Sequence, residues 1–249
     1  LMILFLLLHV IRVFVTRAYR PPGELKWMSG SLVLFVTFAM AYTGYTLVYD
    51  NVSYWGMTVV SSMLGTLPVV GTPLLHLLRG GEEVSGGTLL RHYDLHTKLL
   101  PVFLGGLVIG HVVLVRLLGF AQVEGSRRSH SFFPDHTLKM GAIALALVVL
   151  IVDLVMIFPP TLGPPANPQE VASDVSPPWY FSAAYMWITL LPGPLAIGSL
   201  MVGAALFAAY PLIDRRLAER GWPMPIVNAV VGTIVAVAFA ALMFLDTQM

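Results

Sequence analysis

Five apolar runs, each long enough to cross a bilayer, limit this 249-residue chain to a membrane-embedded helix bundle. The runs are residues 27–48, 95–118, 138–158, 194–213 and 225–245. A spanning helix needs roughly 20 apolar residues, and in hydrocarbon only helices or closed barrels satisfy all their backbone hydrogen bonds. The composition agrees, since 57% of the residues are hydrophobic, 11% are charged and the mean hydropathy is +0.81. We therefore expect an all-α, polytopic transmembrane bundle with five complete helices and with short surface helices in the connections on its outer face.

A sixth apolar run, residues 1–15, reaches Thr16 and Arg17 after only fifteen residues. That length is too short to cross a bilayer, and the run has neither the n-region nor the cleavage site of a signal peptide. We therefore expect the sequence to begin inside a helix.

Most of the basic residues flank three of the connections between the apolar runs. They are Arg12, Arg17, Arg20 and Lys26, then Arg116, Arg127, Arg128 and Lys139, then Arg215, Arg216 and Arg220. By the positive-inside rule these connections face the cytoplasm, and residues 49–94 and 159–193 face the outside. The pattern predicts a multi-pass protein of a bacterial-type inner (cytoplasmic) membrane, in contact with lipid and without a nucleic-acid partner.

Three histidines, His9, His96 and His111, lie within apolar runs, where an imidazole is costly unless it is hydrogen-bonded or ligated. His9 lies about eight residues, roughly 12 Å, from the cytoplasmic end of its helix. His111 lies near the cytoplasmic end of another helix that runs inward, so we expect the two histidines at the same depth. His96 and His111 are fifteen residues apart, about 22 Å of rise, and lie within ~60° of one face. The spacing predicts two stacked haem sites between helices, with His9, His96 and His111 as iron ligands.

Two sites with two imidazoles each need a fourth histidine, which we expect a few residues upstream of Leu1. His92 is the competing ligand, although nineteen residues from His111 place it ~100° from that face. Gly30 and Gly44 lie at matching depths on the intervening helix, where glycine lets a flat macrocycle approach the backbone. The alternatives are histidines that join helices by hydrogen bonds and glycines that serve only close helix packing. Because the chain has no cysteine, covalent haem attachment within these residues is excluded.

Several motifs follow one another in a specific order. They are His9-Val-Ile-Arg12, residues 19–27, Thr43-Gly44-Tyr45, Tyr54-Trp55-Gly56, Leu78-Arg79-Gly80-Gly81, residues 88–91 and Leu95-His96. This series resembles cytochrome b of the Rieske/cytochrome b complexes, and is most like the chloroplast and cyanobacterial branch, whose second histidine pair is fifteen residues apart. From Phe132-Phe133-Pro134-Asp135 onward the chain is similar to the separate subunit IV of that branch, including residues 165–168 and 177–180.

The resemblance divides the chain into haem-binding helices (1–120), a cytoplasmic linker (121–137) and a three-helix quinol-site domain (138–249). It implies that His9 and His111 bind a high-potential haem b, that His96 binds a low-potential haem b, and that Arg12 and Arg91 meet haem propionates. The implied outer quinol-oxidation site comprises Tyr54, Gly56, Pro177, Pro178, Trp179 and Tyr180. The implied inner quinone-reduction site comprises Arg116, Asp135 and Lys139.

Two positions depart from the family pattern. The usual Pro-Glu-Trp-Tyr is Pro177-Pro178-Trp179-Tyr180 here, and proline has no titratable group to take a quinol proton. That step then passes to water or to a neighbour such as Asp174, Tyr180 or Tyr54. The usual Leu-Pro-Trp is Leu47-Val48-Tyr49. Family variants without the glutamate accompany low-potential quinones, which favours menaquinone.

The resemblance implies a cytochrome b subunit of a quinol-oxidising complex, which sends electrons through two haems and translocates protons by a Q cycle. The implied partners are a Rieske iron-sulfur protein, a cytochrome c-type subunit and a second copy of the chain. Two alternatives stay open. One is a dihaem anchor that exchanges electrons with a multihaem cytochrome c or a dehydrogenase without bifurcation, and the other is a structural subunit without haem.

Overall fold

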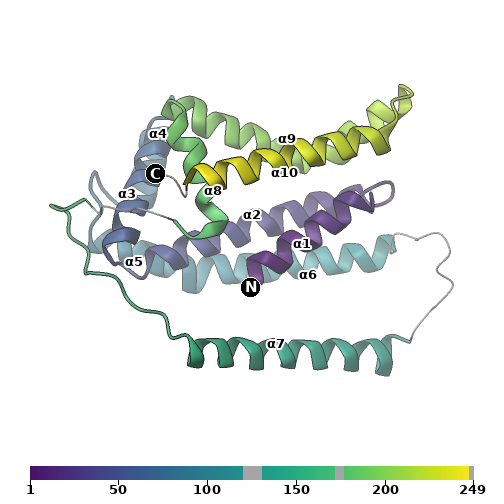
Figure 1. Cartoon of the computed structure of the whole chain (residues 1–249), viewed down its shortest axis with the longest axis horizontal. Helices are drawn as coiled ribbons and strands as arrows, with labels where there is room; N and C mark the ends of the chain where they lie inside the picture. Colours follow the sequence, from purple (N-terminus) through teal and green to yellow (C-terminus); the bar gives the residue numbers. More distant parts are fainter. Residues whose placement is uncertain (120–130, 172–176, 247–249) are drawn as a thin grey trace. The chain divides into compact units, whose positions relative to one another are not determined.

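The computed structural model describes residues 1–119, 131–171 and 177–246, and in them almost all regular structure is helical (Figure 1). The predicted Arg127, Arg128 and Asp174 lie outside these residues. Five helices are long and apolar enough to span a membrane: Glu24–Thr46, Gly86–Leu118, Phe133–Ile157, Gly193–Glu219 and Met224–Asp246. The predicted all-α, multi-pass architecture is confirmed.

The chain forms two compact units. Unit 1 comprises Leu1–Ala121 and Pro164–Met249, and unit 2 comprises Gln122–Gly163. The long helices of unit 1 are α2 (Glu24–Thr46), α6 (Leu100–Leu118), α9 (Gly193–Glu219) and α10 (Met224–Asp246), and the 14-residue apolar α1 (Met2–Val15) precedes them. Its short helices are α3 (Asn51–Gly65), α4 (Gly71–Arg79), α5 (Gly86–Asp94) and α8 (Trp179–Leu190). Unit 2 contains α7 (Thr137–Ile157).

Within unit 1, α2 packs against α6 and α9, α8 packs against α10, and α3 packs against α4 and α9. The helices that follow residue 164 therefore share a bundle with the first 121 residues. The division of the sequence into residues 1–120, a linker at 121–137 and residues 138–249 stays a prediction.

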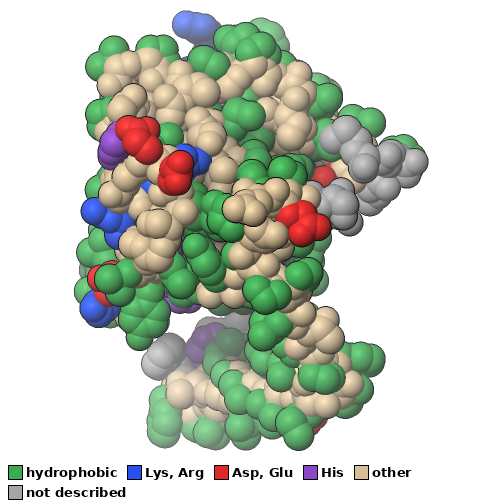
Figure 2. Space-filling view, turned by 90° about the vertical axis from the view of Figure 1, so that its left-hand side faces the viewer, with side chains coloured by type: hydrophobic (Ala, Val, Ile, Leu, Met, Phe, Trp, Pro, Cys, Tyr) green, Lys and Arg blue, Asp and Glu red, His purple; other side chains and the backbone are tan. Residues whose placement is uncertain are grey.

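Short polar signals start and stop the surface helices that lie in the expected outer connections. Asp50 caps α3 by accepting a hydrogen bond from the Ser53 amide at 2.9 Å. Ser85 and Thr88 form a capping box at the start of α5. Gly80 ends α4 in the left-handed region (φ 80°), which glycine adopts without a Cβ clash. Figure 2 looks onto the end of the molecule that carries α3 and α4, where charged side chains gather among apolar ones.

A π-helical turn, Leu95–Leu99, joins α5 to α6, so this span starts at Gly86, nine residues before the predicted run at residue 95. Pro101 explains the turn, because it has no amide hydrogen and its ring displaces the carbonyl one turn earlier. The amide of Leu100 bonds to the Leu95 carbonyl instead. Such single π turns are frequent at functional sites, and this one contains His96.

Most of the large side chains on the long helices are exposed. Lipid replaces water as the solvent of such surfaces in a membrane protein, so apolar exposure is the expected state of a spanning helix.

Candidate functional site

Three histidines of the α5–α6 span contact hydroxyl groups of α2. The Nδ1 atom of His111 lies 2.9 Å from Ser29 Oγ, and that of His96 lies 3.1 Å from Thr43 Oγ1. The Nδ1 atom of His92 lies 2.6 Å from Thr46 Oγ1. All three rings are thus held through the same nitrogen by side chains of one helix.

The hydroxyl groups decide which ring nitrogen carries the proton. Ser29 donates to the Lys26 carbonyl at 3.0 Å, and Thr43 donates to the Ala39 carbonyl at 2.9 Å. A hydroxyl has one proton, so each can only accept from its histidine. The Nδ1 atoms of His96 and His111 must then be protonated, and in the neutral ring this tautomer leaves the lone pair on Nε2. This is the arrangement of a metal-ligating histidine, whose second nitrogen donates to an orienting partner.

Burial separates these two histidines from His92. His96 and His111 are partly exposed and His9 is exposed, whereas His92 is only 1% exposed. A haem macrocycle needs open space on all sides of the ligating nitrogen, far more than the single hydroxyl group of a smaller ligand needs. The surroundings of His96 therefore suit an iron ligand, and those of His92 do not.

The predicted ~100° between the faces of His92 and His111 is wrong, because the helix that carries them is not an unbroken α-helix. The π turn absorbs one extra residue, so the nineteen steps from His92 to His111 act as about eighteen, or five full turns. His92 and His111 consequently both face α2. Pro101 is the sequence signal that could have indicated this.

The glycines of α2 lie directly against the ligand candidates. A Cβ at Gly44 would lie 2.8 Å from His96 Cε1, and a Cβ at Gly30 would lie 3.1 Å from His111 Cε1. A side chain at either position would push the ring away.

These residues fit haem b. Two imidazoles oriented through Nδ1, glycines beside them and no cysteine are the donor set of a non-covalently held haem. Arg12 is exposed one turn after His9, and Arg91 donates to the Leu77 carbonyl at 3.3 Å. Both guanidinium groups could meet carboxylates at the surface, but their predicted role toward propionates stays a prediction.

Two of the predicted outer-site residues, Gly56 and Tyr180, lie near Tyr45, a residue of the Thr43-Gly44-Tyr45 motif that was given no role from the sequence. A Cβ at Gly56 would lie 2.7 Å from Tyr45 Oη, which donates to the Val52 carbonyl at 3.1 Å. Tyr45 also interacts electrostatically with Tyr180. Tyr54 is buried on α3. The structure thus brings Gly56 and Tyr180 to one phenol.

Pro177 and Pro178 lead into α8, and Pro178 is its N-cap. Trp179 is 42% exposed, while burial raises the pKa of the Tyr180 phenol. A phenol is already neutral at physiological pH, and the raised pKa extends the range over which this hydroxyl can donate a hydrogen bond to a bound molecule.

The predicted inner-site residues are divided between the two units. Arg116 is on α6 of unit 1, whereas Asp135 and Lys139 belong to unit 2. Asp135 accepts a hydrogen bond from Ser131 at 3.2 Å. Their grouping into one quinone site stays a prediction.

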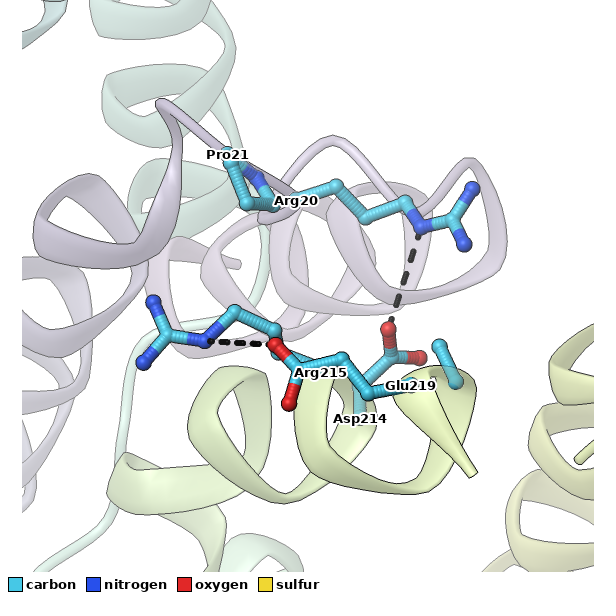
Figure 3. Close-up of a pocket in the computed structure, with 6 residues that line it drawn as sticks. Arg20, Pro21, Asp214, Arg215 and Glu219 are labelled. Carbon is cyan, nitrogen blue, oxygen red and sulfur yellow. Dashed lines mark ion pairs between the residues drawn. The ribbon is translucent and has the colours of Figure 1, made fainter. Parts of the chain in front are cut away.

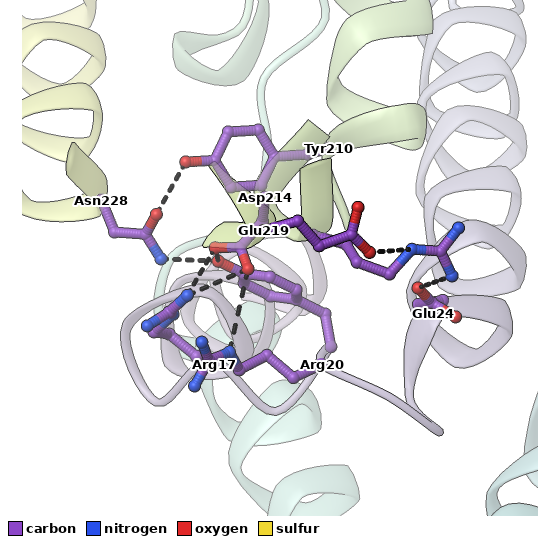
Figure 4. A network of polar contacts seen from close by, with 9 residues as sticks. Arg17, Arg20, Glu24, Tyr210, Asp214, Glu219 and Asn228 are labelled. Carbon is purple, nitrogen blue, oxygen red and sulfur yellow. Dashed lines mark hydrogen bonds and ion pairs between the residues drawn. The ribbon is translucent and has the colours of Figure 1, made fainter. Parts of the chain in front are cut away.

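A buried polar cluster at the end of unit 1 was missed by sequence reasoning (Figure 4). Arg17, in the connection after α1, donates to both carboxylate oxygens of Asp214 on α9, at 2.7 and 2.9 Å. Tyr19 donates to Asp214 at 3.0 Å, and its hydroxyl also contacts the Asn228 amide of α10 at 2.5 Å. Tyr210 contacts the same amide at 2.8 Å.

Burial perturbs the titration of this cluster. It raises the pKa of Tyr19 to about 12. Burial alone would lower the pKa of Arg17, but its hydrogen bonds to Asp214 and Tyr19 outweigh that effect and raise it. The cluster is therefore a fixed ion pair that joins three segments distant in sequence.

An open pocket of about 440 Å³ lies beside this cluster (Figure 3). Its lining residues are Arg20, Pro21, Asp214, Arg215, Ala218 and Glu219. Arg20 lies 3.8 Å from Asp214, and Arg215 lies 3.9 Å from Glu219. The charges of the pocket are therefore paired with one another.

Fold and site define a polytopic helical membrane protein that presents oriented imidazoles between its helices. The cytochrome b (N-terminal)/b6/petB family profile matches residues 1–165. The chain belongs to the cytochrome b family of bc and b6f type, a family of haem-containing electron-transport proteins of membranes.

Individual relatives agree with this assignment. The chain is 32% identical over 230 residues to the cytochrome bc complex cytochrome b subunit of Chlorobaculum thiosulfatiphilum, covering 88% of this chain and 54% of that protein. It is 31% identical over 272 residues to cytochrome b of Allochromatium vinosum, covering 97% and 65%. It is 38% identical over 121 residues to cytochrome b6 of Crocosphaera subtropica, covering 49% and 54%. The chain thus spans about half to two thirds of these relatives.

A chain of the hyperthermophilic respiratory Complex III has the same fold, with a TM-score of 0.72. The match covers 98% of this chain and 73% of that chain at 23% identity.

Proposed function

We propose that this chain is the cytochrome b subunit of a quinol-oxidising complex in a bacterial inner membrane. The observation that supports this most strongly is the orientation of His96 and His111, whose Nε2 lone pairs are left free by their hydroxyl partners on α2. His9 with His111 would hold one haem b, and His96 would hold a second.

The bound haems would supply one-electron transfer across the membrane. The residues of the chain position the quinol and the quinone that exchange electrons with the haems. At the outer site, the neutral Tyr180 phenol donates a hydrogen bond to quinol, and buried Tyr54 and Gly56 shape the pocket. Released protons leave on this side. At the inner site, Arg116, Asp135 and Lys139 would bind quinone and deliver protons from the cytoplasm, which completes a Q cycle.

We infer that the first electron goes to a Rieske iron-sulfur protein and then to a cytochrome c-type subunit, in a complex that contains two copies of this chain. The relative from C. thiosulfatiphilum is described as a subunit of a cytochrome bc complex, which supports such partners. Menaquinone is the proposed quinone, because Pro178 replaces the glutamate of the family motif.

Oxidant-induced reduction tests the proposal. The native complex is supplied with quinol, inhibited at its inner quinone site and pulsed with ferricyanide while the b-haem absorbance is followed. Transient haem reduction is expected, because quinol's two electrons must then take separate routes. Haem that only becomes more oxidised would refute bifurcation and favour a dihaem anchor.

Haem content gives a second measurement. Wild-type protein should contain two haem b per chain, and His96→Leu should lose one of them. His76→Gln is the matched control, because His76 is an exposed histidine in the outer connection, 3.1 Å from Glu82.

A further inference from the structure

The outer site lacks the carboxylate of the family motif, because Pro178 stands in its place. Two buried side-chain atoms of the described residues lack any hydrogen-bond partner. They are Tyr42 Oη on α2 and His92 Nε2 on α5. An unpaired buried polar group costs roughly 1–3 kcal/mol, so such atoms indicate a ligand that completes them.

His92 is held in the tautomer of a base. Thr46 donates its only proton to the Thr43 carbonyl at 2.8 Å, so it must accept from His92 Nδ1, which lies 2.6 Å away. Nδ1 is therefore protonated, and Nε2 carries a lone pair without a donor. At 1% exposure, bulk water does not supply that donor.

Aromatic contacts connect His92 to the outer motif. The rings of His92 and Tyr42 are 5.8 Å apart, and those of Tyr42 and Phe181 are 6.4 Å apart. Phe181 is three residues after Pro178, and its ring lies 4.8 Å from that of Tyr180. The ring of Tyr42 thus lies between the unpaired His92 and Phe181, which belongs to the segment in which the family has its glutamate.

We propose that His92 Nε2 accepts the proton of quinol at the outer site, with Tyr42 Oη as the second polar contact of the same hydroxyl. The inference rests on the function proposed above. The quinol O–H bond breaks, its electron pair stays on oxygen, and the proton forms an N–H bond at Nε2. One electron leaves quinol for the high-potential iron-sulfur acceptor, so charge balances when His92 becomes imidazolium.

Among the described residues of this aromatic series, His92 is the base whose ring nitrogen is buried and unpaired. Tyr42 faces it from α2 and interacts electrostatically with Tyr45 and with Arg79 of α4. The buried Arg79 donates to the hydroxyls of Ser61 and Ser62.

Among the described residues of the other elements, Asp50 lies near Tyr45 and accepts a hydrogen bond from the Ser53 amide at 2.9 Å. Tyr180 is the nearest titratable group of α8 in this aromatic series. On the span of His92 itself, Asp94 is bonded to Lys98 at 2.6 Å, and Arg91 and Tyr93 are exposed.

The test compares His92→Gln with wild type in the native complex. Glutamine is polar and similar in size, but it cannot hold the proton at this position. We expect the quinol oxidation rate to fall about 100-fold, the lower end of general-base effects. The acid limb of the wild-type pH profile, where imidazolium can no longer accept, should disappear. Both haems should remain. His76→Gln, an exposed histidine, should match wild type.

A binding measurement avoids turnover. A hydroxynaphthoquinone, whose acidic hydroxyl mimics that of quinol, is titrated calorimetrically into the oxidised complex. His92→Gln should weaken binding about 10-fold, equivalent to 1.4 kcal/mol for one lost hydrogen bond to a charged or basic group. Tyr42→Phe should weaken it less and leave the pH profile unchanged.

Distinct results separate the possible failures. A His92→Gln complex with two haems, a wild-type rate and the acid limb intact would overturn the proposal while the quinol-oxidising function stands. Loss of one haem would overturn it by making His92 an iron ligand. If the His92→Gln complex does not assemble, the Thr46→Val variant is tested instead. Valine removes the hydroxyl that accepts from His92 Nδ1, so the acid limb of the pH profile should shift. An unshifted acid limb overturns the proposal. A wild-type complex without oxidant-induced haem reduction would refute the underlying function.

Discussion

Replacing Asp214 with alanine should cost this protein more stability than any change to a surface ion pair. The Asp214 and Arg17 side chains are only 4% and 12% exposed. Removing the carboxylate leaves a buried guanidinium uncompensated and takes an acceptor from Tyr19. Breaking a buried pair from one side costs about 3–5 kcal/mol, because the remaining charge keeps its desolvation penalty.

The matched control is Asp94→Ala. Its 2.6 Å bond to Lys98 is as short as that of the buried pair, but the two side chains are 50% and 70% exposed. Exposed pairs of this kind contribute roughly 0–1 kcal/mol, because water solvates each charge when the partner is lost. Comparison of the two variants therefore isolates burial from bond length.

Unfolding in mixed micelles, driven by rising dodecyl sulfate and followed by circular dichroism at 222 nm, gives the free energies. A double variant, Arg17→Leu with Asp214→Leu, should recover most of the loss of Asp214→Leu, since apolar replacement of both partners of a buried pair is often nearly neutral. If Asp214→Ala came within 1 kcal/mol of Asp94→Ala, or the double variant were as unstable as Asp214→Leu, the burial argument would be wrong.

Two further predictions concern haem and pH. Gly44→Ala, whose Cβ would lie 2.8 Å from His96 Cε1, should displace that ring and lower the haem content or shift one b-haem spectrum, whereas Gly198→Ala, where a Cβ meets nothing within 4 Å, should change neither. Burial raises the pKa of Tyr19 to about 12, whereas a tyrosine in the unfolded chain titrates near 10. The unfolded state therefore loses its proton first as pH rises. The free energy of unfolding should fall between about pH 10 and pH 12. The fall is measured as a shift of the same unfolding midpoint; Tyr19→Phe should show a smaller decline, and equal declines would exclude Tyr19 as the cause.

The spanning helices were predictable because a bilayer imposes one requirement on every crossing. Each needs a long apolar run, and the five predicted runs all lie within or close to helices of the structure. Helical rise converts residue number into distance in the same way, and the depths that it gives for His9, His96 and His111 stay predictions.

The outer site was predictable only in part. The motif at Pro177 shows that a carboxylate is missing, but not which group lies behind it. His92 was compared with His96 as an iron ligand because both lie on one apolar run. Only packing against α2 and the ring of Tyr42 shows that His92 is buried and its Nε2 unpaired.

The sequence by itself determined the class of protein, the number of crossings and the residue types that can hold iron, because hydropathy and helical rise act locally along the chain. The tertiary structure decided which hydroxyl of α2 fixes the proton on each histidine and how the π turn rotates His92 toward α2. It also decided that Arg17 pairs with Asp214 across 197 residues. These outcomes depend on which helix faces lie against each other, and no local pattern of residues specifies that.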